Sequence, residues 1–144
     1  MSKKIFFSFH HKSDGHRVAQ VRKSKTVTGY KMNPLFERSK WESIKRHGDH
    51  AVQDWINGEL RETDVTVVLL GEQTGNKKWV NYEIQKSKEM GKGIIGIDIS
   101  KMKDKNGYIT EMGPSPLPAG TPIYSWTEDN GEENLDKWIE KASK

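Results

Sequence analysis

The run VTVVLL at residues 65–70 constrains the fold more than any other part of the sequence. Uncharged aliphatic and β-branched residues in succession are typical of a strand that is covered on both faces, the usual setting of a parallel sheet. Residues 78–90 follow with apolar side chains at helical spacing, and a second apolar run occupies 94–99. A strand, a helix and a second strand in this order predict a right-handed βαβ unit.

The same patterns predict further elements on both sides of this unit. Residues 5–9, IFFSF, favour a short buried strand, and Ser13 or Asp14 is a suitable cap for the helix after it. Residues 100–121 carry repeated glycine and proline and form a long loop; such loops are often lids or binding loops, while others are disordered. The remaining predictions are strands at 26–30 and 122–126 and helices at 49–61 and 131–142.

Alternating strands and helices in 144 residues predict an α/β fold with one domain over residues 1–144. The expected architecture is a flavodoxin-like three-layer sandwich around a parallel five-stranded sheet in the order 2-1-3-4-5. Ligands of such sheets bind beyond the carboxyl ends of the strands, where the strand order reverses between the first and third strands. We therefore expect a site where the strand at 5–9 ends and the helix at 78–90 begins.

Trp79 and Glu83 lie at the head of that helix and share one face of it beside the expected site. Residue types alone leave two interpretations open. A glutamate near a helix N-terminus is often a solvent-exposed partner of the helix dipole, and a tryptophan there often only packs against its neighbours. Alternatively, the pair is part of a binding or catalytic site. Trp41 is similarly open between a peripheral core position and a wall of the site.

Several common occupants of this fold are excluded because their motifs are missing. No aspartate ends the run at 65–70, as a response-regulator receiver requires, and neither GxGxxG nor GxxxxGK[ST] occurs. His10 and His11 are adjacent and would point to opposite sides of a strand, so no metal site is predicted. The chain has no cysteine and no apolar run of roughly 20 residues, which predicts a cytoplasmic protein without a membrane segment.

The charge is unevenly distributed along the chain. Residues 1–47 hold twelve Lys or Arg and three Asp or Glu, a local charge of +9, whereas residues 48–144 carry a local charge of −5. A basic half attracts the phosphate groups of nucleotides, nucleic acids or membranes, and a solvated basic face is an equally good explanation. The lack of clustered aromatic residues argues against a nucleic-acid partner.

Three segments together resemble a known family: KKIFFSFHHKSD at the N-terminus, the helix DHAVQDWINGEL, and TDVTVVLLGEQTGNKKWVNYEIQKSKEMGKGIIGIDI at 63–99. They are similar to the TIR-like domains of bacteria, and the subgroup that they resemble most is that of the Thoeris anti-phage system. The resemblance implies the TIR-like form of the flavodoxin-like fold. It also implies an enzyme that cleaves NAD+ and releases a cyclic ADP-ribose-type messenger.

The resemblance further implies roles for individual residues. The W-x-x-x-E arrangement of the family falls on Trp79 and Glu83, with Glu83 as the catalytic carboxylate. The first strand of the family lines the nicotinamide end of the pocket, and an acidic position follows in the next loop. With Arg17 added as a candidate ligand of the pyrophosphate, the expected substrate-binding residues are Ser8, Phe9, His10, Asp14, Arg17 and Trp79.

The chemistry of NAD+ is compatible with a single carboxylate. Nicotinamide is already a cationic leaving group, so its departure needs no general acid. A carboxylate beneath the ribose stabilises the oxocarbenium-like charge that develops, and Glu83 on a rigid helix suits this role. Trp79 or Phe9 would exclude water and stack on the ring. No cofactor is expected, because NAD+ is the substrate.

The expected partners follow from this hypothesis. They are NAD+ or a related nucleotide, a downstream effector reached through the small-molecule product, and other TIR domains through self-association. No membrane partner is expected. The alternative hypothesis is a non-catalytic TIR-type module that binds a nucleotide or another protein at the same place, because many TIR domains only scaffold.

Overall fold

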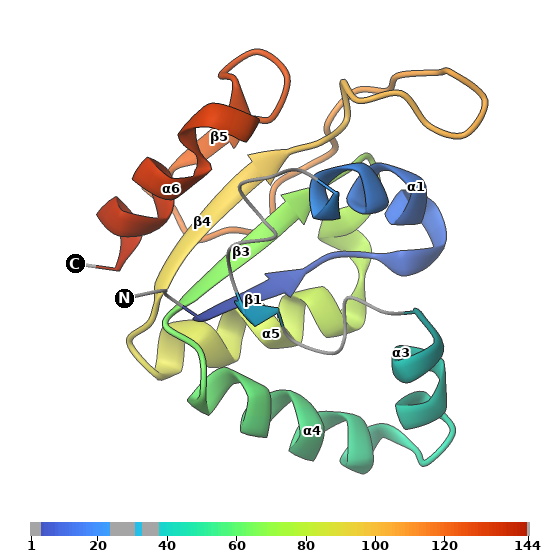
Figure 1. The fold of residues 1–144 in the computed structure, drawn as a ribbon. Coiled ribbons are helices and arrows are strands. Elements are labelled where there is room, and N and C mark those ends of the chain that lie inside the picture. Colours follow the sequence, from blue (N-terminus) through green and yellow to red (C-terminus); the bar gives the residue numbers. More distant parts are fainter. Residues whose placement is uncertain (1–3, 24–30, 33–37, 144) are drawn as a thin grey trace.

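The structure of the chain is a computed structural model that describes residues 4–23, 31–32 and 38–143 (Figure 1). Its strands are β1 (Lys4–Ser8), β2 (Lys31–Met32), β3 (Val65–Leu70), β4 (Gly93–Asp98) and β5 (Ile123–Ser125). They form one sheet in the order β2-β1-β3-β4-β5, and each neighbouring pair is parallel. The α/β class and the parallel sheet predicted from the sequence are confirmed.

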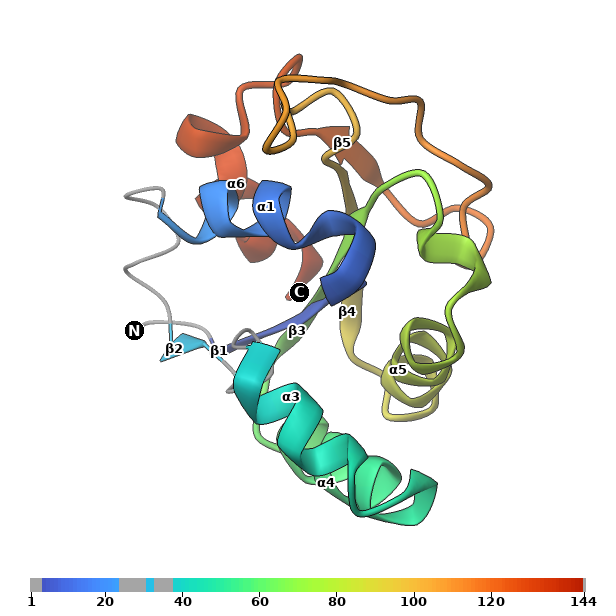
Figure 2. The same cartoon turned by 90° about the vertical axis from the view of Figure 1, so that its right-hand side faces the viewer.

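Helices cover both faces of the sheet (Figure 2). They are α1 (His11–Arg22), α3 (Arg38–Lys45), α4 (Asp49–Arg61), α5 (Lys78–Glu89) and α6 (Gly131–Ala142), with a short 3₁₀ turn, η2, at Thr74–Asn76. α1 and α6 pack against one face, whereas α3, α4 and α5 pack against the other. Across the described residues, none of the helices combines the length and the apolar character needed to cross a bilayer.

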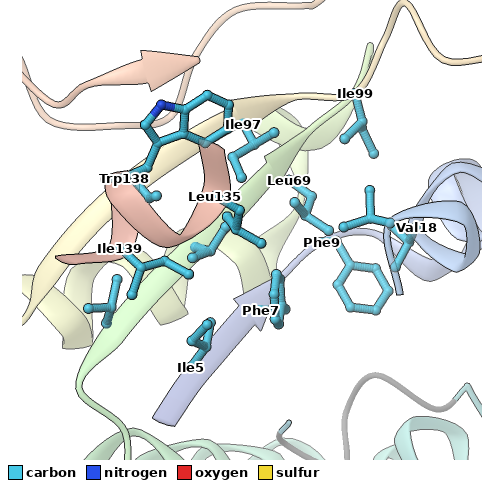
Figure 3. Close-up of a cluster of buried hydrophobic side chains, with 14 of the residues drawn as sticks. Ile5, Phe7, Phe9, Val18, Leu69, Ile97, Ile99, Leu135, Trp138 and Ile139 are labelled. Carbon is cyan, nitrogen blue, oxygen red and sulfur yellow. The ribbon is translucent and has the colours of Figure 1, made fainter. Parts of the chain in front are cut away.

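Alternation along β1 decides which layer each of its side chains meets. Ile5 and Phe7 point to the α1–α6 face, where they join a large apolar cluster (Figure 3). Phe6 and Ser8 point to the opposite face, toward α4 and α5. The helix α6 covers the first of these faces with three buried side chains, Leu135, Trp138 and Ile139.

Three elements have the bounds that the sequence predicts: α4, β3 and α6. The start of α1 differs from the prediction, because the helix begins at His11 and includes Asp14 in its first turn. Neither Ser13 nor Asp14 is therefore its cap. The cause is the short connection, since β1 ends at Ser8 and the chain turns into the helix almost at once.

The segment between α1 and α4 was the least predictable. The strand predicted at 26–30 lies outside the described residues, and the second strand of the sheet is observed at Lys31–Met32. The helix α3 was not predicted at all. Its sequence, RSKWESIK, carries only two large apolar side chains, Trp41 and Ile44, which is too weak a pattern to distinguish a helix.

The long connection between β4 and β5 folds back over the carboxyl ends of the strands. Met112 and Leu117 pack against the apolar cluster beneath α5. The backbone N–H of Gly113 donates to the Gly71 carbonyl, at 3.3 Å, and so joins this connection to the loop after β3. The two loops therefore meet at the edge of the sheet where the fold predicts a ligand site.

Candidate functional site

The helix α5 begins at this edge because the chain turns sharply after β3. The turn η2 is followed by one extended residue, Lys77, before the helix starts. The side-chain amide of Asn81 donates to the carbonyls of Gly75 and Lys77, at 3.1 and 2.9 Å, and fixes the first turn of α5 to the loop. Glu83 lies in the next turn and points inward, toward the sheet.

Glu83 is a buried carboxyl whose partner lies on β1. Only 4% of its surface is exposed. The Ser8 hydroxyl donates to Glu83 Oε1 at 2.6 Å. Ser8 reaches the carboxyl because it is the last residue of β1 and strand alternation directs its side chain toward α5. The site therefore forms at the carboxyl end of β1, beside β3.

Burial raises the pKa of Glu83 from 4.5 to about 8, although the hydrogen bond from Ser8 opposes this increase. Removal from water penalises the charged form of a carboxyl, whereas a donated hydrogen bond favours it. At neutral pH the protonated form of Glu83 therefore predominates. A cation held against the carboxyl would favour its ionised form. Such perturbed carboxyls are frequent at functional sites, and structural networks also produce them.

Glu83 belongs to a line of polar side chains between α5 and the sheet. Ser87, one turn further along α5, donates to the Glu83 carbonyl at 2.7 Å. Its hydroxyl also shares a hydrogen bond of 2.7 Å with the Thr66 hydroxyl of β3. We call Ser8, Thr66, Glu83 and Ser87 the polar seam; all four are buried. Because its groups are hydrogen-bonded, the seam is compatible with burial.

Trp79 lies one turn before Glu83 on the same side of α5 and is half-buried. Its ring meets the ring of Trp41 edge-on, with 6.4 Å between the centroids, and lies 5.6 Å from Tyr82. Trp41 is buried in the cluster that contains Phe6, which supports a peripheral core position, one of the two that the sequence left open. The aromatic side chains of α3 and α5 thus border the turn that carries Glu83.

Asp14 connects α1 to the loop after β3. Its Oδ2 accepts a hydrogen bond from the Thr74 hydroxyl at 3.3 Å, and that hydroxyl accepts one from the Gly71 N–H at 2.7 Å. A Cβ atom at position 71 would lie 2.2 Å from Asp14 Oδ1, so the close approach requires glycine there. Asp14 is therefore engaged with the segment that leads into α5.

Arg17 follows on α1 and is also buried. Its Nε donates to the Met102 carbonyl at 2.7 Å, and its Nη2 donates to the Tyr108 carbonyl at 3.0 Å. Both acceptors belong to the loop after β4. The guanidinium is thus engaged with that loop, and its role as a ligand of pyrophosphate stays a prediction.

Phe9 and His10 follow β1 directly, but their placement differs from that of Ser8, whose side chain is hydrogen-bonded to Glu83. The Phe9 ring lies in the apolar cluster on the α1–α6 face, beside Val18 (Figure 3), and hence on the other side of the sheet from the Ser8 hydroxyl. His10 is half-buried, and its carbonyl accepts from the Asp14 N–H at 3.0 Å. The substrate-binding roles of these residues stay predictions.

Sequence reasoning missed three polar side chains that support the site: Thr66, Thr74 and Ser87. No motif marks them. The only signal in the sequence is that Thr66 lies within an otherwise apolar strand and that Ser8 interrupts the apolar run at 5–9. A hydroxyl at such a position needs a buried partner, which is a hint of a polar contact beneath the covering helix.

Within residues 4–23, 31–32 and 38–143, no group of three or more His, Asp or Glu side chains is placed as metal ligands would be. The predictions that NAD+ is a substrate and that no cofactor takes part are not tested by this geometry.

Comparison with known proteins identifies the family of this chain. The model of the family "Thoeris protein ThsB, TIR-like domain" matches residues 6–104, from β1 to the loop after β4. A relative from Bacillus cereus (strain MSX-D12), named "Putative cyclic ADP-D-ribose synthase ThsB1", is 40% identical over 140 residues, which cover 96% of this chain and 72% of the relative. The parallel α/β fold and this match place the chain among the TIR-like domains. More narrowly, it belongs to the Thoeris ThsB TIR-like family.

Proposed function

We propose that this protein is a TIR-like NAD+ glycohydrolase and cyclase that makes a cyclic ADP-ribose-derived signal in anti-phage defence. The name of the Bacillus cereus relative supports the class of product, and the family supports the Thoeris context. The observation that carries the proposal is the buried Glu83 carboxyl, which receives a hydrogen bond of 2.6 Å from Ser8 at the carboxyl end of β1.

The proposed reaction breaks the bond between ribose C1′ and the nicotinamide nitrogen. The electron pair of that bond leaves with nicotinamide, which becomes neutral, and C1′ acquires oxocarbenium-like positive charge. The Glu83 carboxylate stabilises this charge at close range. A new bond to C1′ then forms either with a nucleophilic nitrogen or hydroxyl oxygen of the same molecule, which gives a cyclic product, or with water, which gives linear ADP-ribose. Water or a hydroxyl group loses its proton as the bond forms. A ring nitrogen of adenine carries no proton, and the positive charge it acquires is relieved by loss of a proton from the exocyclic amino group.

The raised pKa of Glu83 suits a site that receives the cationic nicotinamide ring of the substrate. Without ligand, burial favours the neutral acid. The positive charge of the nicotinamide ring lowers the pKa of a nearby carboxyl, so the carboxylate forms when NAD+ is bound. In a buried site the resulting attraction is stronger than in water. The Ser8 hydroxyl holds the carboxyl in a fixed orientation, which favours catalysis by preorganisation.

Other residues at the same edge of the sheet are proposed to bind NAD+. Trp79 supplies an aromatic surface one turn before Glu83, next to Trp41, and aromatic rings stack well on a flat heterocycle. The proposed substrate-binding residues close to this edge are Ser8, His10, Asp14 and Trp79. The product, rather than a protein contact, is proposed to reach the downstream effector.

Glu83→Gln is the test of this proposal. The substitution removes the negative charge but retains the size of the side chain and an oxygen that accepts from Ser8. We expect the wild-type protein to release nicotinamide from NAD+ and the variant to be slower by roughly 100-fold or more. Glu89→Gln makes the same change at an exposed position of α5 and is the matched control, which we expect to retain activity.

Circular dichroism and thermal unfolding verify that both variants are folded. Mass spectrometry of nucleotides in lysates of infected cells accompanies the assay with purified protein, because activity can depend on infection or self-association. Equal turnover by wild-type protein and Glu83→Gln would exclude Glu83 as the catalytic group. Saturable binding of NAD+ without any product, also in infected cells, would favour the non-catalytic nucleotide-binding module.

A further inference from the structure

We propose that Arg17 is a positioning residue that holds the loop after β4 closed over the strand ends and thereby limits the access of water to the Glu83 site. This inference rests on the proposed function, because it concerns which nucleophile captures C1′. It is an alternative to direct binding of the pyrophosphate by Arg17, and the experiment below distinguishes the two roles.

The Arg17 side chain is buried in the protein and is not exposed to solvent. Only 4% of Arg17 is exposed, and burying this cation is costly unless its N–H groups have acceptors. Its Nε donates to the Met102 carbonyl at 2.7 Å and its Nη2 to the Tyr108 carbonyl at 3.0 Å. A single side chain therefore holds two separate points of the same loop.

The segment between these two points is a compact turn with its own hydrogen bonds. The Asp104 carboxylate accepts from the backbone N–H groups of Asn106 and Tyr108, at 2.8 and 3.0 Å. The hydrogen bond from Tyr108 chiefly, and the charge of Arg17 to a lesser degree, lower the pKa of Asp104. Arg17 thus attaches a preformed turn, 102–108, to α1.

A second residue of α1 strengthens this attachment. The Gln20 amide donates to the Lys103 carbonyl at 2.6 Å. Asp14, Arg17 and Gln20 follow one another at intervals of three residues, so they lie along one side of α1. Asp14 holds the loop after β3 through Thr74, and the other two hold the loop after β4. One side of α1 therefore positions both loops that border the strand ends.

The remainder of the loop crosses the strand ends to the α5 side. A Cβ atom on Gly113 would lie 1.9 Å from the Glu72 carbonyl oxygen, so the loop lies directly against the 71–77 segment. Met112 and Leu117 add apolar contacts beneath α5. Release of the loop at Arg17 would therefore loosen the cover over the edge where α5 begins.

Loosening this cover has a chemical consequence. A nucleophile of the same substrate molecule and water compete for the C1′ atom, and exclusion of water favours the intramolecular nucleophile. A loop that opens more often admits water and shifts the product from cyclic to linear. The breaking of the C1′–nicotinamide bond itself depends on Glu83 and is affected much less.

Arg17→Lys is the principal variant, because it retains the charge but has no planar group to join both carbonyls. Gln20→Ala is the second variant and removes one exposed contact of the same loop. Lys23→Ala is the matched control, since it removes a solvent-exposed charge just after α1. Hydrogen–deuterium exchange of the full protein reports on the loop, and liquid chromatography with mass spectrometry measures linear and cyclic products.

We expect the 102–110 amides to exchange about tenfold faster in Arg17→Lys, consistent with the loss of a hydrogen bond to a charged group. The linear share of the product should rise about threefold or more in Arg17→Lys. In Gln20→Ala, a residue with no proposed contact to the substrate, kcat for nicotinamide release should stay within about twofold. Gln20→Ala should show the same changes to a smaller extent, and Lys23→Ala should show neither.

Each other outcome overturns the inference in a recognisable way. Unchanged exchange in the loop shows that Arg17 does not hold it. A higher KM with unchanged exchange and an unchanged product ratio identifies Arg17 as a direct ligand of the pyrophosphate. Faster exchange without a shift toward the linear product removes the role in excluding water. Wild-type protein that releases no nicotinamide either when purified or in infected cells refutes the proposed function, and the exchange data then still decide whether Arg17 holds the loop.

Discussion

The two faces of the central sheet bury different kinds of side chain. Toward α1 and α6, β1 and β3 contribute only apolar side chains, which pack in one continuous cluster (Figure 3). Toward α5, the same two strands contribute Ser8 and Thr66, which join Glu83 and Ser87 in the polar seam. The apolar side chains of this second face form two separate clusters.

The two faces of the same sheet therefore differ in role: one mainly stabilises the fold, and the other holds the candidate site. The apolar face gains free energy from burial in proportion to its area and has no need of exact polar partners. The α5 face gives up part of that gain to keep a carboxyl out of water at the carboxyl end of β1. A function that needs a buried charge is therefore placed where the opposite face already provides the stability.

The largest expected effect is on the apolar face. Leu135→Ala removes a fully buried side chain of α6, and we expect the free energy of unfolding to fall by about 2–5 kcal/mol. Urea unfolding measures this loss. The rate of nicotinamide release per folded molecule should not change. A parallel loss of that rate would show that the two faces are not independent.

The next effect is a dependence of stability on pH that originates in the polar seam. The pKa of Glu83 is about 8 in the folded protein against 4.5 as its ordinary value. Its contribution to stability is therefore complete below pH 4.5 and is lost as the pH rises through 8, by at most about 1.4 kcal/mol per pH unit. Urea unfolding from pH 4 to 9 should show this decline in wild-type protein. The same series on Glu83→Gln should be flatter, and parallel curves would mean that Glu83 is not buried as described.

The smallest effect concerns the hydrogen bond between Ser8 and Glu83 in the polar seam. Ser8→Ala removes the donor that favours the ionised form of Glu83, so the pKa of Glu83 should rise further. We expect the pH–rate profile of kcat/KM to move to higher pH by about one unit, with about 1 kcal/mol lost in stability. Ser87→Ala, which removes a contact with the backbone carbonyl rather than the carboxyl, should not move the profile. A shift of the same size in both variants would contradict the assigned role of Ser8.

Much of the fold follows from the sequence, because the apolar patterns of its main elements are strong. The strand β3 is uniformly apolar or β-branched, and α4 and α6 carry apolar stripes at helical spacing. The helix α3 lacks such a stripe and is stabilised through Trp41, which packs on α5 and on Phe6. That contact joins distant segments, so no local pattern predicts it.

The candidate site was predictable only in part. The spacing of Trp79 and Glu83 placed both on one side of α5 at the edge of the sheet. The partner of Glu83 was not predictable, since Ser8 is 75 residues away and its orientation depends on strand alternation. The engagement of Arg17 was equally hidden, because its acceptors are backbone carbonyls, which carry no signature in the sequence.

The attachment of the loop by Arg17 also predicts the order in which parts of the chain fold. The two carbonyls that Arg17 holds lie 85 and 91 residues away along the chain. Contacts of such separation gain free energy only after the chain between them has become ordered. We expect the loop to close after the sheet has formed, so that weakening it speeds local opening and leaves the folding rate unchanged. A newly made chain would then complete its core first and enclose its reactive edge last.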